Sequence, residues 1–258
     1  SGRAEHELLA RRLKDLAESA GYFYVVVDSA TTKAHMIDKV FHTVAKQVAW
    51  DDLATAFLRS TLSGSHYLLP EEGSAFNLEQ LAMLNGLDLG EMRRVVNNRL
   101  RDRLFRDYAM TQEFRIAMLR LCQAQLDPQE VGTGIGQAVK DYLCGELRLM
   151  SALKSAFIFQ KIGRHNGRHM LFSLAHWLRV TGKAGLVVVL DISRFLKDKR
   201  PAESDGGLYY SPPAVLDGYE VLRQLVDGTD ELEYCLTVVV APPDLLRPDD
   251  RRGVQRYP

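Results

Sequence analysis

Three short segments of the chain are almost continuously apolar and rich in valine. They cover residues 22–28 (YFYVVVD), 185–192 (GLVVVLDI) and 236–242 (LTVVVAP). Such runs lack the alternation of a half-exposed strand and are typical of a parallel sheet that helices cover on both faces. The pattern therefore predicts an α/β fold with three strands buried on both sides.

Apolar residues three and four positions apart predict helices next to these strands. Residues 9–20 carry one such stripe, which ends at Gly21 just ahead of the first strand. Similar stripes occupy residues 37–48, 170–178 and 221–226. The predicted core is a parallel sheet flanked by helices.

The first two predicted strands are separated by residues 29–184, far more than one crossover helix needs. The apolar spacing within this segment predicts helices over 78–87, 89–126 and 137–149. We therefore predict a helical subdomain over residues 51–150, inserted into an α/β core made of residues 1–50 and 151–258.

Composition narrows the class of protein. The 33 basic and 33 acidic residues cancel, so any nucleic-acid binding requires a local basic patch. Three separated cysteines without a CxxC pair argue against a disulfide framework and a structural zinc site. No apolar run is long enough for a membrane span, and no secretory signal is evident at the N-terminus. We expect a soluble, cytoplasmic protein without a membrane partner.

Two predicted strands end in an aspartate, Asp28 and Asp191. Ligands of open parallel sheets bind beyond the carboxyl ends of the strands, where loops and helix N-termini converge. A carboxylate there, Asp191 above all, suits a Mg²⁺ ion or its water beside a phosphate. The alternative is that each aspartate caps a turn.

The N-terminal residues SGRAEHELL lead directly into a predicted helix, where a nucleotide-binding protein places its phosphate loop. That loop follows the pattern Gly-x-Gly-Lys-Ser/Thr. Alignment on Gly2 puts Arg3 and Ala4 at the next two positions, Glu5 at the lysine and His6 at the hydroxyl residue. Gly2, Arg3, Glu5 and His6 are thus the candidate nucleotide-binding residues, in a degenerate loop.

Further segments follow in a fixed order: GYFYVVVD (21–28), YLCGE (142–146), GLVVVLDISR (185–194), YEVLRQLVDG (219–228), APPDLL (241–246) and DDRRGV (249–254). Together with the N-terminal GRAEHELL, their order and spacing resemble the ATP-binding P-loop proteins of bacteriophage-exclusion (BREX) and related bacterial anti-phage islands. The resemblance covers nearly the whole chain.

This resemblance implies an AAA-like or origin-recognition-like core, with ATP and Mg²⁺ as cofactors. It also implies other defence-system proteins, and DNA, as partners in an oligomeric complex. Asp191 matches the Walker B aspartate, which acts on the metal or water. The family's following catalytic glutamate is replaced by Ile192. Arg251 and Arg252 match paired arginines, which contact a phosphate or a neighbouring subunit.

Glu5 at the lysine position replaces an attraction to phosphate with a repulsion. Each effect is about 1–4 kcal/mol at ~4 Å, so nucleotide binding should weaken by more than about tenfold. We therefore expect a degenerate ATPase-like module that acts in nucleotide sensing or scaffolding. The alternative is an active ATPase whose site is completed by residues outside this chain or by a partner subunit.

A basic segment, residues 93–106, carries six arginines and one aspartate. On an α-helix, Arg99, Arg103 and Arg106 would share one face that could contact DNA phosphates. A second alternative is therefore a DNA-binding adaptor, while the same face could also simply be solvated and paired with acidic neighbours. Arg164 and Arg168 belong to a second basic cluster that could contact phosphate or nucleic acid.

Overall fold

The chain divides into two compact units, which we call the α/β unit and the helical unit. The computed structural model describes residues 2–64, 66–74, 76–127, 129, 134–197, 207–228, 230–246 and 252–254, and only the backbone of residues 2–7. The α/β unit comprises residues 1–47, 163–179 and 183–258. The helical unit comprises residues 48–162 and 180–182.

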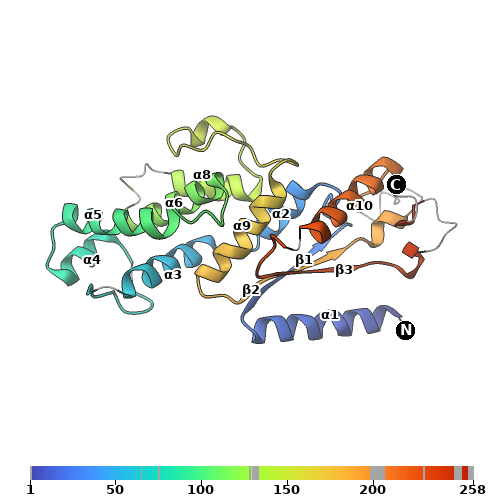
Figure 1. Cartoon of the computed structure of the whole chain (residues 1–258), viewed down its shortest axis with the longest axis horizontal. Helices are drawn as coiled ribbons and strands as arrows, with labels where there is room; N and C mark the ends of the chain where they lie inside the picture. The colour runs from blue at the N-terminus through green and yellow to red at the C-terminus, as the bar shows by residue number, and fades with distance from the viewer. Residues whose placement is uncertain are drawn as a thin grey trace. The chain divides into compact units, whose positions relative to one another are not determined.

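The α/β unit contains a parallel sheet in the order β1 (Tyr22–Asp28), β2 (Gly185–Asp191), β3 (Cys235–Val240) (Figure 1). The prediction of an α/β fold with a parallel sheet is therefore confirmed at this level. Only β2 is buried along its length, as predicted for all three. Val26 of β1 and Leu236 and Val239 of β3 are 42–50% exposed, because both strands are edges of the described sheet.

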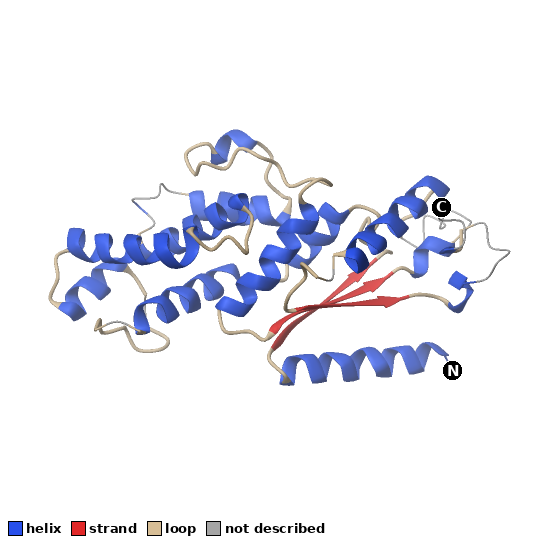
Figure 2. Ribbon diagram, in the orientation of Figure 1, coloured by secondary structure: helices blue, strands red, loops and turns tan. Residues whose placement is uncertain are grey.

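Helices lie on both sides of this sheet. Figure 2 shows α1 (Gly2–Ser19) on one side, and α2 (Ile37–Ala45), α9 (Gly167–Val180) and α10 (Pro212–Asp227) on the other. The apolar stripes predicted for α2 and α9 are buried, which confirms them. Helix α10 packs closely against Phe195 at Gly218, because a Cβ on Gly218 would lie 2.3 Å from the Phe195 ring.

Helix α1 ends before Gly21, which has φ +82°, as its sequence predicts. Its apolar stripe, in contrast, is mostly open, since Leu9 and Leu16 are 67% and 68% exposed. An apolar groove of about 530 Å³ separates α1 from β2 and β3. The cause is that α1 packs mainly on β1, so one helix does not cover this face.

The helical unit contains α3 (Trp50–Ser63), α4 (Leu78–Asn85), α5 (Leu89–Leu100), a π-helical turn (Arg101–Phe105), α6 (Gln112–Leu126), α8 (Ile135–Cys144) and a short 3₁₀ turn (Met150–Leu153). The single helix predicted over 89–126 is wrong. The chain leaves the helix after the π turn and starts α6 at Thr111, whose Oγ1 accepts the Phe114 N–H at 3.3 Å. The helix predicted to reach residue 149 stops at Gly145, which has φ +72°.

Candidate functional site

The two strand-end aspartates lie side by side at the carboxyl edge of the sheet. Asp28 and Asp191 are register partners in β1 and β2. Adjacent strands are about 4.8 Å apart, and paired residues of parallel strands point to the same face. The edge that the sequence marks as a ligand site thus brings two carboxylates together.

Both carboxylates cap the turns that follow their strands. Asp28 Oδ1 accepts the Ala30 N–H at 2.6 Å, and Asp191 Oδ1 accepts the Ser193 N–H at 2.8 Å. These are the short i to i+2 bonds that aspartates make where a strand ends. The turn-capping interpretation therefore accounts for one oxygen of each carboxylate.

Tyr210 connects the loop after β1 to the segment before α10. Its buried hydroxyl accepts the Ala34 N–H at 3.1 Å and lies 2.9 Å and 2.5 Å from the carbonyl oxygens of Ser29 and Thr32. Burial, in the first place, raises the pKa of Tyr210; the hydrogen bond from the Ala34 N–H opposes this effect, and the charge of Asp28 adds to it. The hydroxyl therefore stays protonated and acts as a structural donor.

Arg252 is directed into the α/β unit. The residue is only 5% exposed. Its Nη1 lies 3.3 Å and 2.5 Å from the carbonyl oxygens of Phe195 and Tyr210, and its Nη2 donates to the Tyr209 hydroxyl at 2.8 Å. The hydroxyl of Tyr219 donates to the Arg252 carbonyl. These contacts give the guanidinium a structural role, whereas a phosphate or subunit contact would need it exposed.

Ile192 follows Asp191 and belongs to the hydrophobic core. It is 1% exposed and packs in a cluster with Ala34, Phe195 and Tyr210. Its N–H donates to the Val240 carbonyl at 2.9 Å, which fixes the backbone at this point. A carboxylate here would be buried among apolar side chains, so this position is built for packing.

The remaining candidate nucleotide residues lie in the first turns of α1. The backbone of Gly2, Arg3, Glu5 and His6 is helical, and their side chains are outside the described residues. Arg251 also lies outside the described residues. The structure therefore leaves the degenerate phosphate loop as a prediction from sequence.

A small polar pocket of about 120 Å³ lies beside Tyr210, lined in part by His35, Arg164, Asp217, Glu220 and Gln224. Among the described residues, His35 Nδ1 is buried without a hydrogen-bond partner. Burial, followed by the charge of Arg164, lowers the pKa of His35. The imidazole is therefore neutral near pH 7, and its ring packs edge-on against Tyr210 at 5.4 Å.

The basic cluster of the α/β unit is partly neutralised by α10 and the residues after it. Arg164 Nη1 lies 3.1 Å from Asp217 Oδ2, although both side chains stay about half exposed. Arg168 Nη1 donates to the Gln224 carbonyl at 3.4 Å, and its Nη2 lies 3.9 Å from Glu231 Oε2. A nucleic-acid phosphate would have to compete with these acceptors.

In the helical unit, the predicted DNA-binding residues Arg99, Arg103 and Arg106 are all exposed. Val96, Leu100 and Leu104 are buried, as predicted for this segment. Regular α-helical spacing ends at Leu100, however, so the single α-helical face predicted for Arg99, Arg103 and Arg106 is not formed.

The acidic partner found for Arg101 and Arg106 comes from the same segment. Asp102, in the same π turn, binds Arg106 at 3.2 Å and Arg101 at 3.3 Å. Arg99 and Arg103 are exposed and have no acidic partner among the described residues. This surface therefore keeps two uncompensated cations.

The carboxyl edge fits ATP and Mg²⁺ only in part. Carboxylate oxygens at Asp28 and Asp191 are hard ligands of the kind that Mg²⁺ prefers. Yet no three His, Cys, Asp or Glu side chains form a metal-binding group within the described ranges. Ile192 supplies no second carboxylate, and Arg252 is engaged by carbonyls. The described residues therefore do not fit a site that hydrolyses ATP.

No family model, curated protein or solved structure matches this chain. None of the helices in the described ranges combines the length and apolar character that a bilayer crossing requires.

Tyr210 and His35 were not predicted as site residues from the sequence. The usable signal for Tyr210 is its position next to Tyr209, just before the Ser-Pro-Pro start of α10. A tyrosine that is itself buried usually finds a hydrogen-bond partner for its hydroxyl. His35 has no such signal, since its ring partner Tyr210 and the nearby charge of Arg164 lie more than 120 positions away in the sequence.

Proposed function

We propose that this chain is a degenerate ATPase-like module of a bacterial anti-phage defence system. It acts as a scaffolding or nucleotide-sensing component and works through other proteins of that system. The family resemblance of its ordered segments supports a role in such a defence system. The parallel sheet, with paired aspartates at its carboxyl edge, supports a core of the nucleotide-binding kind.

The packing of Ile192 is the main observation in favour of a chain that does not hydrolyse ATP. An ATPase orients the attacking water with a group beside the metal-binding aspartate. Here that neighbour is a core residue, 1% exposed. Asp191 can still hold a hydrated cation through its second oxygen, so weak Mg-ATP binding without turnover is the expected behaviour.

Calorimetric titration with Mg-ATP, together with an ATP turnover assay, tests this proposal. The wild-type chain, Asp191→Ala and the control Asp52→Ala, an exposed carboxylate in α3, are compared. We expect no turnover from any of them and, at most, weak binding that only Asp191→Ala removes. Magnesium-dependent turnover that is lost in Asp191→Ala and kept in Asp52→Ala would contradict the proposal and support the active ATPase.

A DNA-binding adaptor is the second candidate, favoured by the uncompensated charges of Arg99 and Arg103. If these residues bind DNA phosphates, affinity falls steeply with salt, with a log–log slope of about 0.9 per phosphate contact. The triple variant Arg99→Gln, Arg103→Gln, Arg106→Gln should lower that slope. The control replaces the exposed Arg11, Arg12 and Lys14 of α1. Equal DNA affinity of the triple variant and the wild type at low salt would exclude this candidate.

A further inference from the structure

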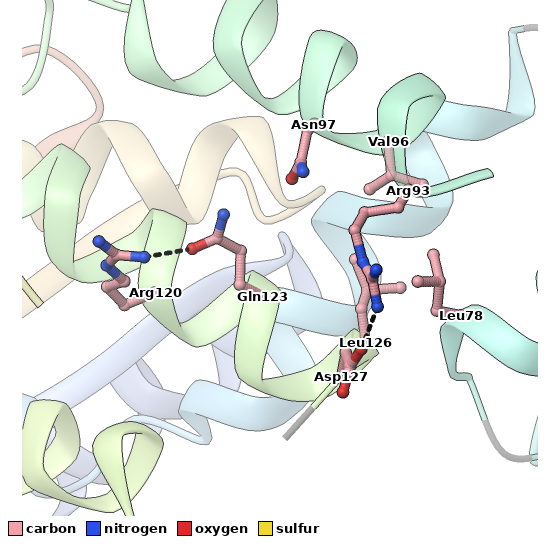
Figure 3. A pocket seen from close by; sticks show the side chains of 8 residues that line it. All are labelled: Leu78, Arg93, Val96, Asn97, Arg120, Gln123, Leu126 and Asp127. Atoms are coloured by element: carbon pink, nitrogen blue, oxygen red, sulfur yellow. Dashed lines mark hydrogen bonds and ion pairs between the residues drawn. The ribbon is translucent and has the colours of Figure 1, made fainter. Parts of the chain in front are cut away.

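The helical unit contains a pocket that the proposed function does not use. It has a volume of about 170 Å³ and lies between residues of α4, α5 and α6 (Figure 3). Polar side chains from α5 and α6 occupy one part of its lining, and three buried apolar side chains occupy another. We call it the helical-unit pocket.

Arg120 is the key cation of this pocket. Its Nη1 donates to Gln123 Oε1 at 3.0 Å, and its Nε donates to the Ala156 carbonyl at 3.3 Å. The guanidinium also stacks over Phe157, 5.5 Å from the ring centre. No carboxylate pairs with Arg120 among the described residues, and burial lowers its pKa. A partly buried guanidinium held only by neutral acceptors gains from an incoming anion.

Gln123 and Asn97 add hydrogen-bond donors to the same space. A guanidinium can only donate, so the side-chain oxygen of Gln123 must face Arg120. The NH₂ group of Gln123 is then turned toward Asn97, which projects from α5 (Figure 3). Donors from two helices thus face one small volume.

The charge and the walls of the pocket define the ligand. Arg93 is paired with Asp127 at 2.7 Å, so these two charges cancel, and among the described lining residues Arg120 leaves a net charge of +1. The apolar part of the lining is formed by Leu78, Val96 and Leu126, each less than 9% exposed. Figure 3 shows Arg120 at one end of the pocket and these apolar side chains at the other, with Gln123 between them. A cation at one end and an apolar wall at the other suit a monoanion with an apolar part. Inorganic phosphate has no such part and more charge than the pocket balances.

We propose that the helical-unit pocket binds a small organic carboxylate. The carboxylate lies against Arg120 and the amide of Gln123, and its aliphatic part extends along the pocket toward Leu78, Val96 and Leu126 at the other end. The planar guanidinium matches a carboxylate in two parallel hydrogen bonds. This site belongs to the helical unit alone and stands independently of the proposed function.

Methyl-labelled NMR tests this proposal, because Leu78, Val96 and Leu126 carry methyl groups in the pocket wall. Butyrate is titrated into the full chain, with butyramide as its uncharged analogue and inorganic phosphate as a second anion. We expect saturable shifts confined to these methyl groups with butyrate, and at least about tenfold weaker binding of butyramide, since a charged hydrogen bond contributes about 1.5–3 kcal/mol. Equal affinity for butyramide, tighter binding of phosphate, or unsaturable shifts throughout the chain would each overturn the proposal.

Variants assign the binding to Arg120. Arg120→Gln should weaken butyrate binding at least tenfold, whereas Arg94→Gln, which removes an exposed charge from α5, should leave butyrate affinity unchanged. Arg120→Lys keeps the charge without the planar fork and should show an intermediate affinity. The same methyl spectra report whether each variant is folded. Wild-type affinity in folded Arg120→Gln would overturn the proposal, and if that variant does not fold, Arg120→Lys and the butyramide comparison decide.

Discussion

The carboxyl edge of the sheet and the helical-unit pocket use polar groups in opposite ways. At the edge, Asp28, Asp191 and Tyr210 form hydrogen bonds with nearby backbone groups. In the pocket, Arg120 and Gln123 satisfy each other only in part and leave donors facing an open volume. Binding capacity therefore depends on which donors the fold leaves open, more than on where polar residues gather in the sequence.

Side-chain length explains much of this contrast. A short aspartate at a strand end reaches the N–H two residues ahead and closes its own turn. Arg120 and Gln123, three residues apart on α6, reach each other over the helix surface and extend beyond it. One oxygen of each edge aspartate is thereby bound within its own turn, whereas the pocket is preorganised by one internal hydrogen bond.

The strongest test of the closed edge is Ile192→Glu, which introduces the carboxylate that an ATPase would place there. Because Ile192 is 1% exposed among apolar side chains, we expect a loss of more than about 4 kcal/mol in the free energy of unfolding, measured in urea. Ile192→Val, which keeps the apolar character, should cost about 0.5–1.5 kcal/mol. A stable Ile192→Glu protein would mean that the edge can open, and its ATP turnover would then be measured.

The sequence anticipates the edge far better than the pocket. The valine-rich runs locate β1 and β2 to within one residue and place Asp28 and Asp191 at their carboxyl ends, because the apolar run of a strand and its end are local properties. The structure adds that the two strands are neighbours. The turn-capping role of the aspartates also lies within two residues of each.

Contacts that depend on distant residues were not predictable. Tyr210 binds the Thr32 carbonyl across 178 positions, and no local pattern encodes that partner. The burial of Arg252 depends in the same way on Phe195 and Tyr210. The pocket requires side chains of α5 and α6 to line one space, which the uninterrupted helix predicted over 89–126 would have prevented.

A second test of the edge is Tyr210→Phe. The change leaves the Ala34 N–H without its acceptor in a buried position, so we expect a loss of about 1–3 kcal/mol of stability. Tyr108→Phe is the matched control, since Tyr108 is 80% exposed, and it should change stability by less than about 0.5 kcal/mol. Similar stabilities of the two variants would show that the hydroxyl of Tyr210 does not hold the loops together.

A smaller change in stability is expected when a fall in pH protonates His35, which lines the polar pocket beside Tyr210. The pKa of His35 is lowered in the folded chain, first by burial and then by Arg164, while Asp217 and Asp38 oppose Arg164 and Lys33. The unfolded chain therefore takes up the proton first, and stability is lost as pH falls below the unfolded pKa of about 6.5. Unfolding at pH 7.5 and 5.5 should show a larger loss for the wild type than for His35→Gln. An equal loss in both would mean that His35 does not contribute to the pH dependence.

The smallest change in stability is expected for Asn97→Ala, and it probes the open character of the helical-unit pocket directly. Asn97 is exposed on α5 and its side chain has no hydrogen bond among the described residues, so its removal leaves no partner unsatisfied. Alanine is the better helix former, so stability should be unchanged or rise by up to about 0.7 kcal/mol. Butyrate affinity should fall between about twofold and tenfold, as expected for the loss of one neutral donor. A stability loss above about 1 kcal/mol would instead show that Asn97 is locked into the fold as Tyr210 is, and the contrast between the two regions would fail.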